Sequence, residues 1–395
     1  MTDAWICGAL RTPVGKHGGA LATVRADDLA AIPIKALVER SGIDPRSIDD
    51  VILGCTNQAG EDNRNVARMA LLLAGLPVEV PGQTVNRLCG SGLQAAASAA
   101  QAIKAGEGQV FVAGGVESMT RAPYVTLKAG EPWSRKRPET ADTTVGWRFT
   151  NPRLPQPWTI ALGETAEVVA ARYGIGRAEQ DAFAVESQRR AEAALQACVF
   201  TDELVAVPLP DGTTFARDEA PRTGTTLAGV ARLKPAFRAD GTVTAASASG
   251  INDGAAALLV MGPAAAAAGR GPAPLARIVA TAVAGVDPSC MGLGPIPATQ
   301  KALARAGMTI DQIDLVELNE AFAAQALACI RELRLDPATV NIYGGAIALG
   351  HPLGATGARI LTTLVHALGR TRSRYGLATM CIGVGQGIAM IVERV

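Results

Sequence analysis

Two stretches of the chain repeat one order of apolar and polar positions. Residues 33–53 (PIKALVERSGIDPRSIDDVIL) and 297–318 (PATQKALARAGMTIDQIDLVEL) both run through Lys-Ala-Leu and a glycine to Ile-Asp-x-Val-x-Leu. Each order predicts a helix, a turn and a buried strand. Such self-similarity indicates that the chain contains a duplicated α/β unit.

The segments that follow the two repeats also correspond. Cys89 and His351 each lie in a glycine-rich turn, and a helix-like run and an apolar strand follow each turn, at 93–105 and 109–113 after Cys89 and at 358–368 and 376–380 after His351. Strands that alternate with helices favour two mainly parallel sheets with helices on their outer faces. Because both halves need a covered face, we also expect helices between the sheets.

The stretch between the two halves differs in character. It holds three of the four tryptophans and many prolines and arginines, which predict loops. One amphipathic helix is predicted from small and apolar residues spaced by three or four, at Ala184, Ser187, Ala191, Leu195 and Cys198. We therefore expect an N-terminal α/β half at 1–118 plus 250–272, an inserted loop domain at 119–249 and a C-terminal α/β half at 273–395.

Composition narrows the function classes. The 395 residues are 48% hydrophobic, and 37 Lys and Arg balance 36 Asp and Glu, so we expect a large core and no general attraction for nucleic acid or membranes. The apolar runs are shorter than the ~20 residues of a membrane span. The N-terminus lacks a secretory signal, and the seven cysteines include no C-x-x-C pair, which favours a cytoplasmic protein without a metal site.

Cys89 is a candidate nucleophile. It follows an apolar strand and precedes a predicted helix, where unpaired amides and the helix dipole stabilise a thiolate and lower a thiol pKa that is otherwise near 8.5. The flanking glycines leave an open approach to the sulfur. A packed core thiol is the alternative for a cysteine in this setting.

His351 is the candidate base for Cys89. It occupies the repeat-equivalent turn, so a two-fold arrangement of the halves brings the two turns together. An imidazole there accepts the thiol proton and later stabilises oxyanion charge. For the other two histidines, His17 in an N-terminal loop and His366 within a helix, a solvated or capped side chain is the expected role.

Two further strand ends carry polar chemistry. Cys381 follows the last predicted core strand and is suited to move a proton at the α-carbon of a thioester, with a buried thiol as the alternative. Asn319 follows the strand of the second repeat and is suited to hold a water in an oxyanion hole, with a helix cap as the alternative.

With these residues assembled, the chain resembles the thiolase family from end to end. The resemblance lies in VNRLCGSGLQA at 85–95, NEAFAAQ at 319–325, GGAIALGHPLGATGAR at 344–359 and CIGVGQG at 381–387. It implies the thiolase fold, in which duplicated α/β halves form a five-layer αβαβα core with an inserted loop domain, assembled as homodimers or homotetramers. It also implies coenzyme A thioesters as ligands, coenzyme A itself as a substrate, and no permanently bound cofactor.

The resemblance assigns a role to each matching position. Cys89 corresponds to the acylated nucleophile, His351 to its activator, Cys381 to the acid/base and Asn319 to the holder of an oxyanion-hole water, while the amides of Cys89 and Gly383 correspond to a second oxyanion hole. The coenzyme A contacts of the family fall on Arg222, Ala236, Phe237 and Ser249, and the acyl pocket falls on Met291 and Phe322.

The implied reaction is thiolytic cleavage of a 3-oxoacyl-CoA by coenzyme A, through an acyl-Cys89 intermediate, to acetyl-CoA and a shortened acyl-CoA. Residues 25–40, 57–77 and 143–152 are most similar to family members that cleave 3-oxoadipyl-CoA in aromatic-acid breakdown. A dicarboxylic tail needs a cation, for which Arg148 and Arg153 are candidates, with solvation at the surface as the alternative.

Several alternatives stay open at this point. Within the family they are an acetyl-CoA C-acetyltransferase and a 3-ketoacyl-CoA thiolase of fatty-acid β-oxidation. A decarboxylating ketoacyl synthase has the same duplicated plan but pairs its cysteine with two histidines, and here Asn319 stands at the second histidine position. A relative that only binds acyl-CoA is expected to lack the cysteines or the histidine, and this chain has all three.

Overall fold

The computed structural model describes residues 3–57, 59–269 and 271–395. Ten of its strands form one hydrogen-bonded sheet in the order β12-β13-β14-β11-β1-β10-β5-β3-β4, with the short β2 attached to β10, and β6 with β7 and β8 with β9 form two separate two-stranded sheets. No helix among the described residues has both the length and the hydrophobicity that crossing a bilayer requires. The path divides between β1 and β11 into two parts.

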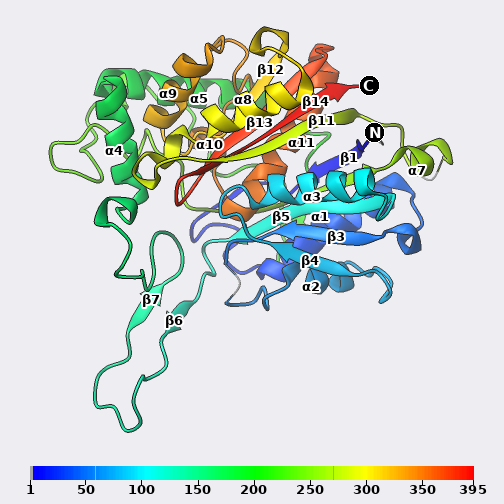
Figure 1. Cartoon of the computed structure of the whole chain (residues 1–395), viewed down its shortest axis with the longest axis horizontal. Coiled ribbons are helices and arrows are strands. Elements are labelled where there is room, and N and C mark those ends of the chain that lie inside the picture. The colour runs from blue at the N-terminus through cyan, green and yellow to red at the C-terminus, as the bar shows by residue number, and fades with distance from the viewer. Residues whose placement is uncertain (1–2, 58, 270) are drawn as a thin grey trace.

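The strands nearer the N-terminus form one part of the path (Figure 1). Their bounds are β1 Trp5–Arg11, β2 Gly15–Lys16, β3 Asp50–Gly54, β4 Gly82–Val85, β5 Val110–Ser118 and β10 Asn252–Met261. The other part consists of β11 Ala276–Gly285, β12 Leu315–Leu318, β13 Tyr375–Ile382 and β14 Gln386–Arg394. Only two residue pairs, Trp5 with Arg277 and Ile6 with Ala276, join β1 to β11.

The prediction of mainly parallel sheets is wrong. Parallel pairing is confined to β3 with β4, β3 with β5 and β12 with β13, while the remaining neighbours on the path are antiparallel. For β13 and β14 the reason is local, because only residues 383–385 connect them, and a parallel pair needs a crossover of a dozen or more residues.

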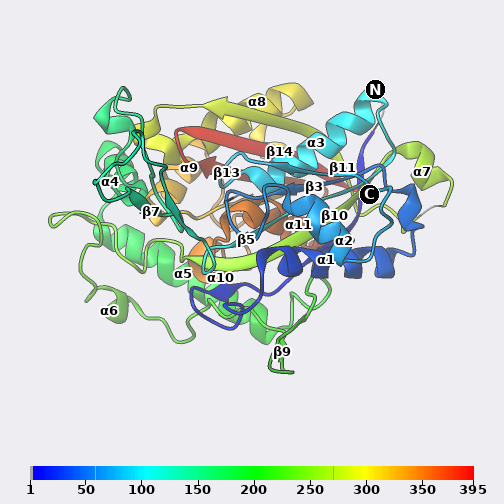
Figure 2. The same ribbon diagram turned by 90° about the horizontal axis from the view of Figure 1, so that it is seen from below.

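Helices cover the two parts of the sheet in the predicted order of layers. α3 Ser91–Ala105 and α11 Leu353–Thr371 pack on each other and between the two parts, and α11 contacts strands of both. The outer layers are α1 Ala26–Ser41 and α2 Val66–Leu73 on one side and α8 Pro295–Ala306 and α9 Ala323–Leu333 on the other. This arrangement gives the five layers, which Figures 1 and 2 show from two directions.

The predicted repeat is confirmed. The first copy is α1, a 3₁₀ turn at Pro45–Ser47 and β3, and the second is α8, a 3₁₀ turn at Ile310–Gln312 and β12. Each helix ends at a left-handed glycine, Gly42 and Gly307, both with φ of 65°. A left-handed residue after the last turn is the usual helix stop that glycine permits, so both copies end their helix by the same local chemistry.

Glycines let the two central helices touch. A Cβ placed on Gly92 in α3 lies 2.7 Å from the amide nitrogen of Ala358, and one placed on Gly357 in α11 lies 2.2 Å from the amide nitrogen of Leu93. Contacts this short with backbone atoms exclude any side chain at either position. The helix starts that carry Cys89 and His351 are therefore held close together, as the repeat predicted.

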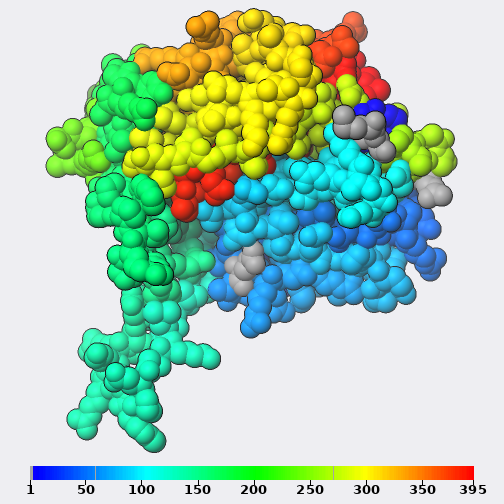
Figure 3. All heavy atoms as spheres, in the orientation of Figure 1, coloured from blue at the N-terminus to red at the C-terminus, as the bar shows by residue number. Residues whose placement is uncertain are grey.

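The segment between Ser118 and Asn252 contributes no strand to the long sheet path in the described part of the chain. Its elements are β6 Tyr124–Thr126, β7 Thr140–Asp142, a 3₁₀ turn at Gln156–Trp158, α4 Leu162–Tyr173, α5 Arg177–Gln196, β8 Val207–Pro208, β9 Thr214–Phe215 and α6 Leu227–Val230. The β6–β7 hairpin projects from the body of the molecule (Figure 3). The short α7 Pro263–Ala267, the 3₁₀ turn Pro288–Leu293 and α10 Ala346–Leu349 lie outside this segment.

One detail of the predicted amphipathic helix is wrong. α5 buries Ala184, Ser187 and Ala191 as expected, but it ends at Gln196. Cys198 is exposed, with a left-handed φ of 53°, so it belongs to the turn after the helix and not to its apolar face.

Candidate active site

Cys89 lies between β4 and the start of α3, and its side chain is half-buried. The backbone N–H of Gly383 and its own amide both donate toward the sulfur. Burial nevertheless outweighs these donors and raises the pKa of the thiol to about 11. The expectation of a lowered pKa is therefore wrong, and Cys89 needs a base to become a thiolate.

His351 precedes α11 and is only 5% exposed. Its Nδ1 lies 2.7 Å from the Thr356 hydroxyl, which itself donates to the Pro352 carbonyl at 2.9 Å. Because a hydroxyl has one hydrogen to donate, Nδ1–H is the donor to Thr356 and Nε2 carries the free lone pair. Burial, followed by the charge of Arg359, lowers the pKa of His351 to about 3, so the imidazole is neutral at pH 7.

Asn319 meets the other side of the imidazole. Its Nδ2 lies 3.4 Å from His351 Nε2, and its backbone N–H donates to the Thr379 carbonyl at 3.0 Å, which extends the β12–β13 ladder by one residue. The side chain caps no helix, because α9 begins at Ala323 and has Phe322 at its N-cap. The polar function of Asn319 is thus directed at His351.

Cys381 lies near the end of β13 and is 2% exposed. Burial raises the pKa of its thiol well above the usual value, and the nearby Cys89 raises it further. The two sulfurs are therefore close enough to interact electrostatically. Gly383, two residues beyond Cys381, supplies the amide that faces Cys89, so the β13–β14 turn connects both cysteines.

An apolar cluster surrounds Cys381. Met291 and Phe322, the two residues predicted for an acyl pocket, are buried in it together with Ala166, Val243 and Ala321. Phe237 extends the cluster outward, because its ring meets that of Phe322 edge-on at a centroid distance of 6.0 Å. The structure thus brings the predicted acyl-pocket residues to the candidate acid/base.

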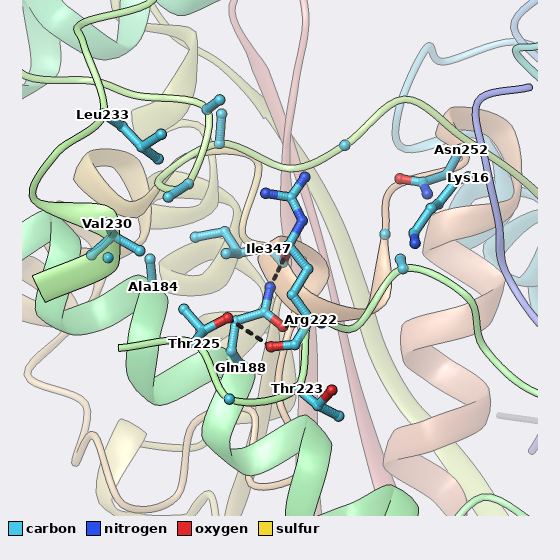
Figure 4. A pocket seen from close by; sticks show the side chains of 18 of the residues that line it. Lys16, Ala184, Gln188, Arg222, Thr223, Thr225, Val230, Leu233, Asn252 and Ile347 are labelled. Carbon is cyan, nitrogen blue, oxygen red and sulfur yellow. Dashed lines mark hydrogen bonds between the residues drawn. The ribbon is translucent and has the colours of Figure 1, made fainter. Parts of the chain in front are cut away.

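A cavity of about 570 Å³ (Figure 4) borders this cluster at Ala248, which lines the cavity and packs against the cluster. Three basic side chains contribute to its wall, Lys16, His17 and Arg222, and none of its described lining residues is acidic. Arg222 is held through its backbone, since its N–H donates to Gln188 Oε1 at 2.8 Å and its carbonyl accepts from Thr225. Its guanidinium extends across the cavity, and Lys16 and Asn252 lie on the opposite wall (Figure 4). The cavity is suited to a polyanion.

The other residues predicted to contact coenzyme A do not line this cavity. Ser249 lies between two lining residues, Ala248 and Gly250, and its amide donates to the Ala321 carbonyl at 2.9 Å. Ala236 is exposed and pairs through its amide with Val243, and Phe237 is turned toward Phe322. These three positions border the apolar cluster around Cys381 more closely than the basic wall.

Three supporting residues escaped the sequence analysis. Thr356 fixes the tautomer of His351, and Asn252 accepts from the His351 backbone N–H at 3.0 Å. Glu117, buried at the end of β5, accepts from Thr56 and from the Gly354 N–H at 2.8 Å. Thr356 could have been noted from its place five residues after His351 on a helix, whereas nothing local in the sequence links Asn252 or Glu117 to His351 or α11.

The candidate cations for a dicarboxylic tail lie elsewhere. Arg148 is exposed and donates weakly to the Thr143 carbonyl at 3.5 Å, and Arg153 is exposed in a loop. Neither belongs to the cavity that Arg222 lines.

Comparison with known proteins gives one consistent family. The family models described as thiolase, N-terminal domain, and thiolase, C-terminal domain, match residues 4–264 and 272–394. The chain is 57% identical to the 3-oxoadipyl-CoA/3-oxo-5,6-dehydrosuberyl-CoA thiolase of Escherichia coli, with 100% of both chains covered, and 54% identical to the beta-ketoadipyl-CoA thiolase of Pseudomonas aeruginosa, with 100% of this chain and 99% of that protein covered. Human mitochondrial 3-ketoacyl-CoA thiolase in complex with CoA superposes with a TM-score of 0.94 at 40% identity, covering 100% and 98% of the chains.

Proposed function

The chain belongs to the thiolase family, and we propose that it cleaves 3-oxoadipyl-CoA with coenzyme A to succinyl-CoA and acetyl-CoA. The observation that carries this proposal is the full-length identity of 57% to an enzyme named for that substrate, in a chain that also contains the two cysteines and the histidine of the site. Full coverage matters because the identity then extends over the inserted segment as well as over the catalytic turns.

The first half-reaction acylates Cys89. Neutral His351 accepts the thiol proton, and the resulting thiolate attacks the 3-keto carbon of the substrate. The C2–C3 bond then breaks, leaving a succinyl thioester on Cys89 and the enolate of acetyl-CoA. Cys381 donates its thiol proton to C2 of that enolate, and acetyl-CoA leaves. A neutral base of low pKa next to a thiol of high pKa keeps both groups uncharged until the substrate arrives.

The second half-reaction returns the enzyme to its starting state. The Cys381 thiolate accepts the thiol proton of incoming coenzyme A, whose sulfur attacks the acyl carbon on Cys89. Succinyl-CoA forms as the C–S bond to Cys89 breaks, and His351 returns its proton to the Cys89 sulfur. Atoms and charges balance over the two steps, with coenzyme A consumed and two thioesters formed from one.

Two groups of donors are placed to stabilise the developing oxyanions. The amides of Cys89 and Gly383 both point toward the Cys89 sulfur, where the carbonyl of an acyl group bonded to it would lie. Asn319 and His351 form the other pair, on which a polarised thioester oxygen or an intervening water would be held. The basic cavity accounts for the phosphates of coenzyme A, with Arg222 as the chief cation.

We further propose that the chain assembles as a homodimer or homotetramer. β4 is the last strand on its side of the sheet path and leaves one edge open, and next to it Leu72 and Leu73 of α2 are 40% and 52% exposed. The projecting β6–β7 hairpin carries Trp133, which is 97% exposed. Sedimentation velocity at several concentrations tests this, and a monomer throughout would reject it.

Two measurements test the reaction. Incubation with 3-oxoadipyl-CoA, without free coenzyme A, is expected to add one succinyl group to Cys89, identified by peptide mass spectrometry. Cys198→Ser should retain the adduct and Cys89→Ser should lack it. An unmodified Cys89 under these conditions would favour a protein that only binds acyl-CoA.

Steady-state thiolysis of acetoacetyl-, 3-oxoadipyl- and 3-oxohexadecanoyl-CoA tests the substrate. The highest kcat/KM is expected for the dicarboxylic substrate, and a higher value for either of the others would transfer the assignment to a biosynthetic or a fatty-acyl thiolase. Arg148→Ala and Arg153→Ala test the candidate cations, since an unchanged ratio of adipyl to fatty-acyl kcat/KM rejects a role for either.

A further inference from the structure

Two pairs of side chains connect the β12 segment with the α11 segment. The first pair, Asn319 with His351, lies just after β12 and just before α11. The second or lower pair, Glu317 with Arg359, lies within these elements, and Glu317 Oε2 is 4.0 Å from Arg359 Nη1. Glu317 precedes Asn319 by two residues on the same strand, so both side chains leave the same face. Arg359 follows Thr356 by three residues on α11, which places it on the face that supports His351.

The lower pair is fully buried. Arg359 and Glu317 are each 2% exposed, and none of the three guanidinium nitrogens makes a hydrogen bond to the described part of the chain. Glu317 Oε2 makes none either. A buried ion pair without supporting hydrogen bonds is seldom a net source of stability, because desolvation of both charges offsets their attraction. A contribution to the fold alone therefore does not explain it.

Other charged groups surround the pair. Arg11 forms ion pairs with Glu203 and Asp218, and Glu203 also accepts from Thr363 of α11. Glu320 lies nearby and accepts from Ser187, Asn341 and the Ile347 N–H. These carboxylates already have donors within hydrogen-bonding distance, which leaves Glu317 as the closest partner of Arg359. Burial raises the pKa of Glu317 to about 8 in spite of the Arg359 charge, so the Glu317 carboxyl exchanges its proton near neutral pH.

We propose that Glu317 and Arg359 are positioning residues, which fix α11 against β12 and thereby hold His351 in contact with Asn319. The proposal rests on the proposed function only in taking His351 as the base for Cys89. The Arg359 charge has a second effect on the same group, since it lowers the pKa of His351 beyond what burial does. The pair thus acts on both the place and the protonation of the imidazole without touching the substrate.

The lead variant is the double substitution Glu317→Gln with Arg359→Met, which removes the titratable carboxyl and the guanidinium charge together and leaves no unpaired ion in the core. We expect kcat for thiolysis to fall about tenfold or more with KM within about twofold, the size of effect typical for groups that orient a catalytic side chain. Arg359→Lys, which keeps the charge, should recover part of this loss. Leu368→Ala, in the last part of the same helix and fully buried, is the control for destabilisation of α11 alone and should lower Tm without lowering kcat.

A second readout excludes a merely structural role. The pH dependence of Cys89 alkylation by iodoacetamide reports the protonation of His351, and this measurement needs no acyl-CoA. In the double variant the acid limb of this profile should move to higher pH, because an imidazole freed from the Arg359 charge binds a proton more readily. A double variant whose kcat and alkylation profile both match those of the natural chain would overturn the proposal. If the natural chain fails to cleave 3-oxoadipyl-CoA while the alkylation profile shifts as described, the substrate assignment falls and the positioning role stands.

Discussion

The turns before α3 and α11 occupy equivalent places in the two repeats, each with its reactive residue two positions before the helix, yet they hold these residues in different ways. Cys89 is half-buried, and main-chain amides are the donors near its sulfur. His351 is almost fully buried, and side chains hold both of its ring nitrogens. Backbone donors suit an atom that changes its bonds during a reaction, because they stabilise charge without specifying one neighbour. Side-chain partners suit a base whose tautomer and orientation must stay fixed.

The largest effect is expected at the nucleophile. Cys89→Ser should lower kcat for thiolysis by about 10⁴-fold or more, because an alcohol is far less acidic and less nucleophilic than a thiol in the same place. Cys198→Ser, at the exposed cysteine, is the matched control and should keep full activity. Retention of more than a few per cent of the activity by the first variant would contradict the role of Cys89.

The second-largest effect on kcat is expected when the base His351 is removed. His351→Gln is expected to lower kcat by about 10³-fold, within the range for removal of a general base. Its Cys89 should also react with iodoacetamide only at a pH near that of an unassisted buried thiol. His366→Gln is the control, since His366 bonds to the Ala9 carbonyl, away from the site. If His351→Gln and His366→Gln gave the same alkylation profile, His351 would not be the base that activates Cys89.

The stability of the fold should depend on pH through His351. Because its folded pKa is lowered, the unfolded chain binds the proton more readily between pH 6.5 and about 3, and stability is lost as pH falls through that window. The slope contributed by one group is about 1.4 kcal/mol per pH unit, so the loss from pH 6.5 to 5 is about 2 kcal/mol. Urea unfolding at both values should show a smaller loss for His351→Gln, and an equal loss in both chains would place the titration elsewhere.

The smallest effect is expected at the hydroxyl behind the base. Thr356→Val removes the acceptor for Nδ1–H and should lower kcat about tenfold while KM stays nearly constant. Thr362→Val offers a matched control on the same helix, because the Thr362 hydroxyl is buried and bonds to none of the described residues. If both variants behave alike, packing and not the hydrogen bond explains the loss.

Local chemistry decided what the sequence could predict. The repeats at 33–53 and 297–318 predict a helix, a turn and a strand, because apolar spacing and a glycine at the helix end are local features. Both copies fold as expected. The pairing of Asn319 with His351 depends on the register of α11 against β12, which no local pattern encodes, whereas Thr356 lies only five residues after His351 at the start of the same helix. The pKa of Cys89 was predicted in the wrong direction because a helix start is visible in the sequence, whereas the protein that encloses the sulfur is not.

The contact between Gly92 and Gly357 has a consequence for how the chain tolerates change. The backbones of the two helices are in contact there, so a methyl group at either glycine would push α3 and α11 apart and would separate Cys89 from His351. The closest approach of the two helix backbones therefore sets the distance between Cys89 and His351, although neither residue makes that contact. A side chain at either of these two glycines would therefore change the spacing of the reactive pair directly.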